Sequence, residues 1–319
     1  MLQPSEFKGL TVSYATRLVL ALALGAGALA AQKSDEEPIF RTDTRLVVLH
    51  VTVVDKNGRL ITTLPESAFQ VFENGVPQKV KLFKREDVPV SMGLVIDNSG
   101  SMRDKRQKVA AAAVALVKDS NKEDEVFVVN FNDEAYLDCD FTNKIEKMDQ
   151  ALSRIDSAGG TAMREAISMS IKYMKEKAKK DKKVILVVTD GNDNASTISL
   201  ENLVKQAQQS EVIVYTIGLL SEEEKREAKR AKRALDLLTE ATGGQAYYPK
   251  ELVDVERIAH QVAHDIRNQY ILAYTPATLD GSFRQIKVVA NGPGHPTVRT
   301  RTGYYATPDA VNAKTNSGY

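Results

Sequence analysis

The stretch Val90–Met102 constrains the fold more than any other part of the chain. Its apolar first half has the length of a strand and ends at Asp97, after which Ser99 and Ser101 follow. The next segment, Arg103 to Lys118, carries apolar residues at helical spacing. This order predicts a buried strand, a tight polar loop and a helix. In an open α/β sheet, such a loop lies in the crevice beyond the carboxyl ends of the strands, where ligands usually bind.

Downstream of this stretch, strand-like and helix-like patterns alternate. The predicted strands are Glu125–Phe131, Val184–Val188, Val212–Ile217 and Gln245–Tyr248, and the predicted helices are Lys144–Ile155, Ala162–Lys177, Leu200–Gln209, Glu222–Ala241 and Asp254–Arg267. Strands that alternate with helices indicate a mainly parallel sheet covered on both faces. We therefore expect the α/β class, with a doubly wound, mainly parallel sheet.

Further strand patterns flank this region on both sides. They are Leu46–Val54, Ala68–Glu73 and Val76–Phe83 before it, and Tyr270–Tyr274, Phe283–Val289 and Val298–Tyr304 after it. Neither flank has enough strands to bury its apolar face alone. We predict that both flanks form one small β-sandwich-like module, with the α/β domain inserted between them.

The first residues have the pattern of a secretory signal peptide. Lys8 and Arg17 precede an apolar run, Leu18–Leu29, and Ala28–Ala31 offers small residues for cleavage. The run is shorter than the roughly 20 residues that a transmembrane helix needs. We expect a secreted, periplasmic or cell-surface protein without membrane insertion after cleavage, and an uncleaved anchor is the alternative.

The predicted organisation is a signal peptide (1–31), a linker (32–45), an N-terminal β flank (46–87), an α/β domain (88–268), a C-terminal β flank (269–305) and a tail (306–319). The 43 Lys and Arg residues and the 42 Asp and Glu residues leave a net charge of +1, which gives no support for a nucleic-acid partner. The single cysteine, Cys139, excludes an intramolecular disulfide and a cysteine-based zinc cluster.

Two further segments bring oxygen ligands to the same edge of the predicted sheet. A second buried strand ends at Asp190, and the glycine-rich loop Ser157–Thr161 delivers a hydroxyl just before a helix. Because the carboxyl ends of parallel strands share one edge, Asp97 and Asp190 should meet there, where they repel each other unless a cation compensates. The oxygen-only set of Asp97, Ser99, Ser101, Thr161 and Asp190 suits Mg²⁺, with Mn²⁺ or Ca²⁺ as alternatives. With only two charged ligands, the cation would accept an incoming carboxylate.

The five residues, in the order DxSxS…T…D, resemble the metal-ion-dependent adhesion site of von Willebrand factor type A domains. The resemblance covers roughly residues 88–267. The flanking segments Val71–Gly75, Tyr270–Tyr274 and Arg301–Tyr305 are similar to the bacterial VWFA-related family first described in acidobacteria. The resemblance implies a Rossmann-like fold, a Mg²⁺ held by the five residues, some of them through water, and a protein partner that offers an acidic side chain.

Enzymatic motifs are not matched, and we expect no enzyme. Neither Ser99 nor Ser101 stands in the G-x-S-x-G context of a hydrolase, and Ser99 stands where a haloacid-dehalogenase-type site would need a second carboxylate. His260 and His264 have zincin spacing, but Gln261 replaces the required glutamate. The predicted function is an extracytoplasmic protein-binding or adhesion module. The alternatives are a metal-independent scaffold in cell-envelope complex assembly and hydroxyl side chains that only cap helices.

Overall fold

The computed structural model describes residues 46–85, 87–153, 157–191, 193–221 and 225–307. These residues belong to one compact unit. The predicted signal peptide and linker, residues 1–45, lie outside the described residues. Within the described ranges, every helix is too short or too polar to cross a membrane.

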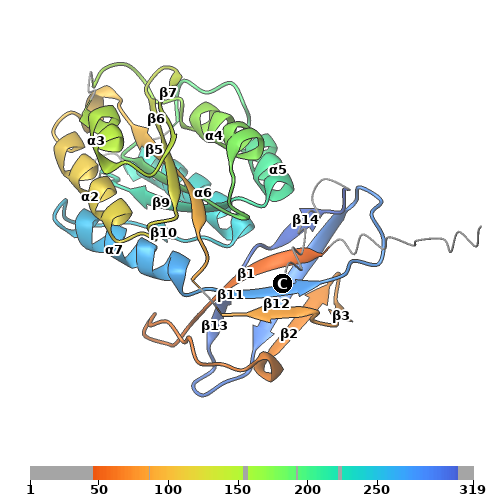
Figure 1. Cartoon of the computed structure of the whole chain (residues 1–319). Coiled ribbons are helices and arrows are strands. Elements are labelled where there is room, and N and C mark those ends of the chain that lie inside the picture. The colour runs from red at the N-terminus through yellow and green to blue at the C-terminus, as the bar shows by residue number, and fades with distance from the viewer. Residues whose placement is uncertain (1–45, 86, 154–156, 192, 222–224, 308–319) are drawn as a thin grey trace, which may run out of the picture. The chain divides into compact units, whose positions relative to one another are not determined.

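A six-stranded sheet forms the centre of the α/β domain, in the order β10-β9-β8-β5-β6-β7 (Figure 1). Its strands are β5 (Val90–Asp97), β6 (Glu125–Phe131), β7 (Ala135–Thr142), β8 (Lys182–Thr189), β9 (Ile213–Gly218) and β10 (Ala246–Tyr247). All neighbours are parallel except β7, which pairs antiparallel with β6. Strand β5 lies between β8 and β6, and all eight of its residues are buried.

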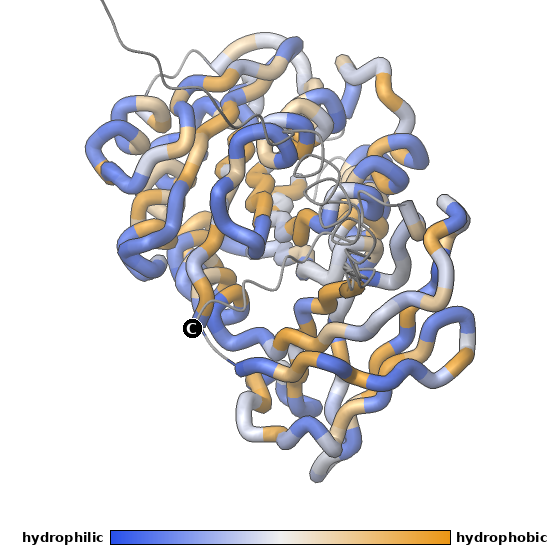
Figure 2. Tube along the Cα trace, turned by 45° about the vertical axis from the view of Figure 1, so that its right-hand side comes forward, coloured by the Kyte–Doolittle hydropathy of each residue, from blue (hydrophilic) through white to orange (hydrophobic). Residues whose placement is uncertain are grey.

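Helices cover both faces of this sheet (Figure 1). Their bounds are α2 (Arg106–Lys118), α3 (Ile145–Ser153), α4 (Met163–Lys177), α5 (Leu200–Ser210), α6 (Lys225–Thr242) and α7 (Asp254–Arg267). One apolar core joins α2, α3 and α7 to the sheet, and a second joins α4, α5 and α6 to the other face. The period of two along β5 sends Leu94 into the first core and Val95 into the second. Figure 2 shows the hydrophobic stretches concentrated in the central strands. The doubly wound α/β prediction is confirmed.

Two four-stranded sheets form a second module, called the β module below. Their orders are β13-β1-β11-β4 and β14-β12-β2-β3. The strands are β1 (Val47–Val54), β2 (Phe69–Glu73), β3 (Val76–Gln78), β4 (Leu82–Lys84), β11 (Tyr270–Tyr274), β12 (Phe283–Ala290), β13 (Thr297–Arg299) and β14 (Gly303–Tyr305), with a short 3₁₀ helix, η1 (Glu66–Ala68), before β2. Strand β1 pairs antiparallel with β11 and β13, and β2 pairs antiparallel with β12. Apolar residues of both sheets share one core.

Two predicted strands of the flanks are wrong in extent. The segments Val76–Phe83 and Val298–Tyr304 were each expected as one strand, but each is two short strands that belong to different sheets. The chain crosses between the sheets at residues 79–81 and 300–302. Local propensity cannot register such a crossing, because the residues on both sides favour strands and only the pairing partner changes.

Two elements of the α/β domain also differ from expectation. The edge strand β7 was not predicted, because its charged residues dilute the apolar pattern. The helix expected from Arg103 begins at Arg106, after a short 3₁₀ turn, η2 (Gly100–Met102).

Side chains join the β module to the α/β domain. The Gln269 amide donates to the hydroxyl oxygen of Thr52 at 3.0 Å and to that of Tyr215 at 3.3 Å. The Arg299 guanidinium donates to the carboxylate of Asp265 at 2.8 Å. These bonds hold both modules within one compact unit.

A buried carboxylate fastens the two sheets of the β module to each other. Glu73, on β2, accepts hydrogen bonds from the hydroxyl groups of Tyr274 on β11, at 2.6 Å, and Tyr304 on β14, at 2.8 Å. Both tyrosines are buried. Burial, assisted by the charge of Glu73, raises the pKa of both phenols, so they stay hydrogen-bond donors. Three segments that are distant in the sequence therefore meet at one carboxylate.

We expect Tyr304→Phe to lower the free energy of unfolding by roughly 1.5–3 kcal/mol, the range for a hydrogen bond to a charged group. Glu73→Ala should cost more, because two buried hydroxyls lose their acceptor. Urea unfolding followed by circular dichroism measures both effects. The matched control is Tyr136→Phe, an exposed tyrosine whose loss of hydroxyl should change stability by less than about 0.5 kcal/mol. Equal unfolding curves for Tyr304→Phe and the parent would contradict this role of Glu73.

Candidate metal-binding site

Asp97 is the last residue of β5 and lies at the centre of the carboxyl edge of the sheet. Its side chain is fully buried. One carboxylate oxygen, Oδ1, accepts from the backbone N–H of Ser99 at 2.8 Å, and the other, Oδ2, accepts from the Thr189 hydroxyl at 2.6 Å. Thr189 is the last residue of the neighbouring strand β8. The carboxylate is therefore held in place from both the loop and the adjacent strand.

The environment of Asp97 disfavours its charge. Burial raises the pKa of this carboxyl, and the nearby charge of Asp190 acts in the same direction. The hydrogen bonds from Thr189 and Ser99 oppose the shift without cancelling it. A buried carboxylate costs free energy unless a cation or further donors compensate for its charge. The site thus has a physical need for positive charge.

A chain of hydrogen bonds links Ser99, Ser101 and Asp190. The hydroxyl oxygens of Ser99 and Ser101 lie 3.2 Å apart, and the Ser101 hydroxyl donates to Asp190 Oδ1 at 2.8 Å. Ser99 and Asp190 are buried, whereas Ser101 is exposed. The loop after β5 and the loop after β8 are therefore in direct contact through side chains that sequence analysis selected.

Thr161 reaches the same edge from a third loop. Its backbone N–H donates to Asn194 Oδ1 at 2.8 Å, and its side chain is buried. A β-carbon placed on Gly191 would lie 3.6 Å from the Thr161 hydroxyl oxygen, so this hydroxyl lies beside the residue that follows Asp190. The backbone N–H of Gly100 donates to the carbonyl of Gly159 at 3.4 Å, which joins the first loop to the third. All five predicted residues therefore lie at the end of β5 or on three adjoining loops.

Two cations near these residues were not singled out by the sequence. Lys105 forms an ion pair with Asp190, whose side chain is almost completely buried. The Arg106 guanidinium is buried, donates to Asn130 Oδ1 at 3.1 Å, and leaves Nε and Nη1 without a hydrogen-bond partner. Burial lowers the pKa of Arg106 to about 10, and the charge of Asp97 opposes this shift. Both residues stand in the first turn after the motif, where basic residues ordinarily indicate only a solvated helix face.

The residues present fit a hard divalent cation by donor chemistry. Two carboxylates and three hydroxyl groups offer only oxygen, and one carboxylate is fully buried. Among the described residues, no cluster of three or more His, Cys, Asp or Glu side chains offers an alternative metal site. His260 and His264, the pair with zincin spacing, are exposed on α7, and His260 pairs with Asp119.

Gly159 in the third loop and Gly100 in the first loop should differ in how well they tolerate substitution. Gly159 has φ of +78°, and a β-carbon there would lie 2.1 Å from Asp133 Oδ2. The same carboxylate accepts from the Gly160 N–H at 2.7 Å, which limits its room to move. At Gly100 the nearest atom to an added β-carbon would be 3.9 Å away.

We therefore expect Gly159→Ala to destabilise the metal-free protein by about 1–2 kcal/mol, the cost of left-handed backbone for a residue with a β-carbon. The matched Gly100→Ala variant should change stability by less than about 0.5 kcal/mol. Urea unfolding in the presence of a chelator compares the two variants. Equal losses of unfolding free energy in both variants would show that the left-handed backbone at Gly159 does not limit substitution there.

The family model for the von Willebrand factor type A domain matches residues 92–295, more than half of the chain. No curated protein matches the sequence. A von Willebrand factor type A structure from Catenulispora acidiphila is 13% identical, covers 85% of this chain and 76% of its own, and has a TM-score of 0.49.

Two pilus proteins give similar values. The PilB minor pilin from Streptococcus sanguinis is 14% identical with a TM-score of 0.46, and the match covers 57% of this chain and 62% of the pilin. The vWF domain of the type V pili tip protein Mfa5 from Porphyromonas gingivalis is also 14% identical with a TM-score of 0.46, covering 57% of this chain and 97% of that domain. These structural similarities are too distant to carry a functional argument. The family match decides the assignment: the chain belongs to the von Willebrand factor type A domain family, whose members are generally protein-interaction modules and not enzymes.

Proposed function

We propose that this protein is an extracytoplasmic binding or adhesion module that captures an acidic side chain of a partner protein through a divalent cation. The observation that carries the proposal is the buried Asp97 carboxylate, which lies beside Asp190 and three hydroxyl groups on adjoining loops. The cation would be Mg²⁺, with Mn²⁺ or Ca²⁺ as alternatives. Asp97, Ser99, Ser101, Thr161 and Asp190 would hold it.

The roles of these residues follow from their positions. Asp97 supplies buried negative charge that Thr189 and Ser99 hold in place. Ser101, the exposed member of the set, marks the side from which a partner can approach. A bound divalent cation keeps excess positive charge when only two of its ligands are carboxylates, and it can therefore accept a third carboxylate from outside. Asp190 must exchange its pairing with Lys105 for the cation.

The ion pair between Lys105 and Asp190 also favours a second candidate function. Because Lys105 neutralises Asp190 without metal, the domain can remain folded and present its surface in the absence of a divalent cation. In that case the protein would act as a metal-independent scaffold in the assembly of a cell-envelope complex. Partner capture from envelope extract in Mg²⁺ and in chelator separates the two functions, because only the first requires the cation.

Calorimetric titration of the mature protein with Mg²⁺ or Mn²⁺ should show one weak site. Asp97→Asn should abolish binding, since it removes a charged ligand while keeping the side-chain size. Lys105→Gln should tighten binding, because the competing ammonium is removed. At a free Mg²⁺ concentration of 100 times Kd, the parent should gain about 2.7 kcal/mol of stability and Asp97→Asn none.

The matched control is Asp104→Asn, which removes an exposed carboxylate that stands in the same loop but outside the predicted set. It should titrate like the parent. If Asp97→Asn binds Mg²⁺ as the parent does, or if Asp104→Asn loses binding equally, the ligand assignment is wrong.

Export depends on residues that lie outside the described part of the chain. We expect Leu18–Ala31 to direct the protein out of the cytoplasm, with cleavage near Ala30 or Ala31. Mass spectrometry of the intact protein from culture medium and cell fractions measures the new N-terminus. Recovery of an uncleaved Met1 terminus from the soluble cytoplasmic fraction would contradict export.

A further inference from the structure

A cavity lies at the amino edge of the parallel sheet, opposite the edge that holds Asp97. Its volume is about 550 Å³, and its lining includes Lys182 and Ile213, the first residues of β8 and β9. Val48 of β1 and Ile271 of β11 also line it, so it lies where the β module meets the α/β domain. The seven-residue rise from Lys182 to Thr189 separates this edge from the Asp97 site by roughly 23 Å.

Three polar residues of the lining have buried atoms without hydrogen-bond partners. These atoms are Nε, Nη1 and Nη2 of Arg301, Nδ1 of His50 and Oε1 of Glu211. Arg301 Nη1 and Glu211 Oε1 form an ion pair, but their separation of 3.6 Å is too long for a hydrogen bond. Each unsatisfied buried group costs about 1–3 kcal/mol, and native proteins tolerate few of them. Several such groups around one cavity offer hydrogen-bond partners to a molecule that enters it.

The charge of the lining identifies the kind of molecule. Lys180 and Lys183 also line the cavity, are half-buried, and form no ion pair within the described part of the chain. Burial, together with the charges of Lys182, Arg301 and Lys183, lowers the pKa of His50, so this imidazole adds no positive charge at neutral pH. Asp181 and Glu211 are the acidic residues of the described lining and are outnumbered by the basic ones. A ligand that restores the balance must carry negative charge.

Much of the remaining lining is apolar, with Val48, Ile213 and Ile271 among its residues. We propose that this cavity binds a small amphipathic anion, with its carboxylate or phosphate at Arg301 and Lys183 and its apolar body against these three side chains. A guanidinium matches either group through two parallel hydrogen bonds. The volume lies within the range of about 300–1,000 Å³ that is typical of small-molecule sites.

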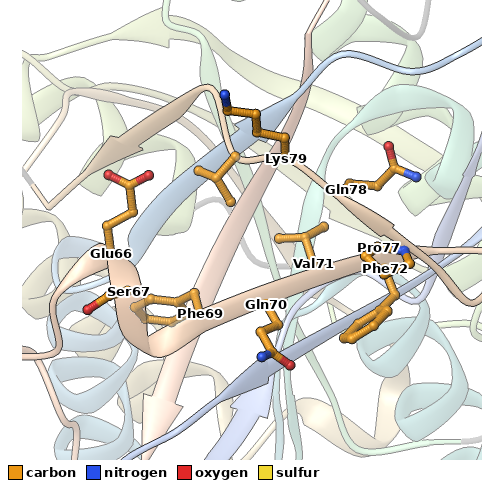
Figure 3. A pocket seen from close by; sticks show the side chains of 10 residues that line it. Glu66, Ser67, Phe69, Gln70, Val71, Phe72, Pro77, Gln78 and Lys79 are labelled. Atoms are coloured by element: carbon orange, nitrogen blue, oxygen red, sulfur yellow. The ribbon is translucent and has the colours of Figure 1, made fainter.

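A larger hollow of the β module, about 770 Å³, lacks these features (Figure 3). Glu66 and Lys79 stand there beside Phe69 and Val71. Among the side chains that Figure 3 draws, none has a buried polar atom without a partner. Nothing in that lining calls for a ligand.

Competition for a fluorescent anion tests the proposal on the mature protein. The probe is 8-anilinonaphthalene-1-sulfonate, and the competitors are octanoate, octyl phosphate, 1-octanol and inorganic phosphate. We expect octanoate, octyl phosphate or both to displace the probe at least tenfold more effectively than 1-octanol or inorganic phosphate. Preference between the two anions then assigns the ligand as a carboxylate or as a phosphate. Displacement should be the same in Mg²⁺ and in chelator, because the metal site is at the other edge.

Variants locate the site. Arg301→Gln should weaken displacement by octanoate or octyl phosphate about tenfold, and Lys183→Gln, at a half-buried position, about threefold. Glu211→Gln should strengthen it, because the carboxylate that competes for Arg301 is removed. The matched control, Lys147→Gln, changes an exposed lysine of α3 and should behave like the parent. If 1-octanol competes as well as the anions, or if folded Lys183→Gln and Glu211→Gln both match the parent, the proposal is wrong.

Discussion

The buried carboxylate of Asp97 at the end of the central strand is the constraint to which the rest of the site responds. In a parallel sheet that is covered on both faces, a polar site finds room beyond the carboxyl ends of the strands, where the loops lie. Here Thr189 and the backbone of Ser99 hold the carboxylate, while Lys105 and Arg106 place positive charge next to the site. In the proposed function, a divalent cation would take the place of Lys105 as the partner of Asp190, and the ion pair would compensate the Asp190 carboxylate whenever the cation is absent.

The two edges of the parallel sheet have opposite chemistry. The carboxyl edge presents Asp97, Asp190 and hydroxyl groups, whereas the amino edge begins with Lys182 and Lys183 and faces Arg301 of the β module. The β module closes the second edge, and it is itself held by Glu73 between Tyr274 and Tyr304. The β module therefore also forms part of the wall of a cavity.

Most of the α/β domain could be predicted from the sequence, because its long periodic segments bury one side of each helix and both sides of each strand. Glu125–Phe131 was even predicted with the bounds that β6 has in the structure. What failed were features that depend on distant partners. The chain crosses between sheets at residues 79–81 and 300–302, and β7 follows β6 as a polar edge strand. In each case the pattern along the chain is that of a strand or a loop, and only the neighbour in space decides which sheet it joins.

The candidate site shows the same division. Asp97, Ser99, Ser101, Thr161 and Asp190 follow from a motif and from the rule that parallel strands end at one edge. Lys105 and Arg106 do not, because helical spacing does not show that Lys105 pairs with Asp190 or that Arg106 is buried. Glu73, Tyr274 and Tyr304 each stand in a predicted strand, but only the structure shows the hydrogen bonds that join them.

The N-terminal strands of the β module pair with C-terminal strands, so the module can complete its sheets only late in synthesis. Glu73 leaves the ribosome 231 residues before Tyr304, whose hydroxyl group donates a hydrogen bond to the Glu73 carboxylate. At roughly 5–20 residues per second, the N-terminal strands wait on the order of ten to fifty seconds for their partners. The α/β domain is complete before then, while the first strands still have unpaired edges. Under the proposed export, this delay would keep the chain from folding completely too early, because its earliest strands cannot finish their sheets until Tyr304 has been made.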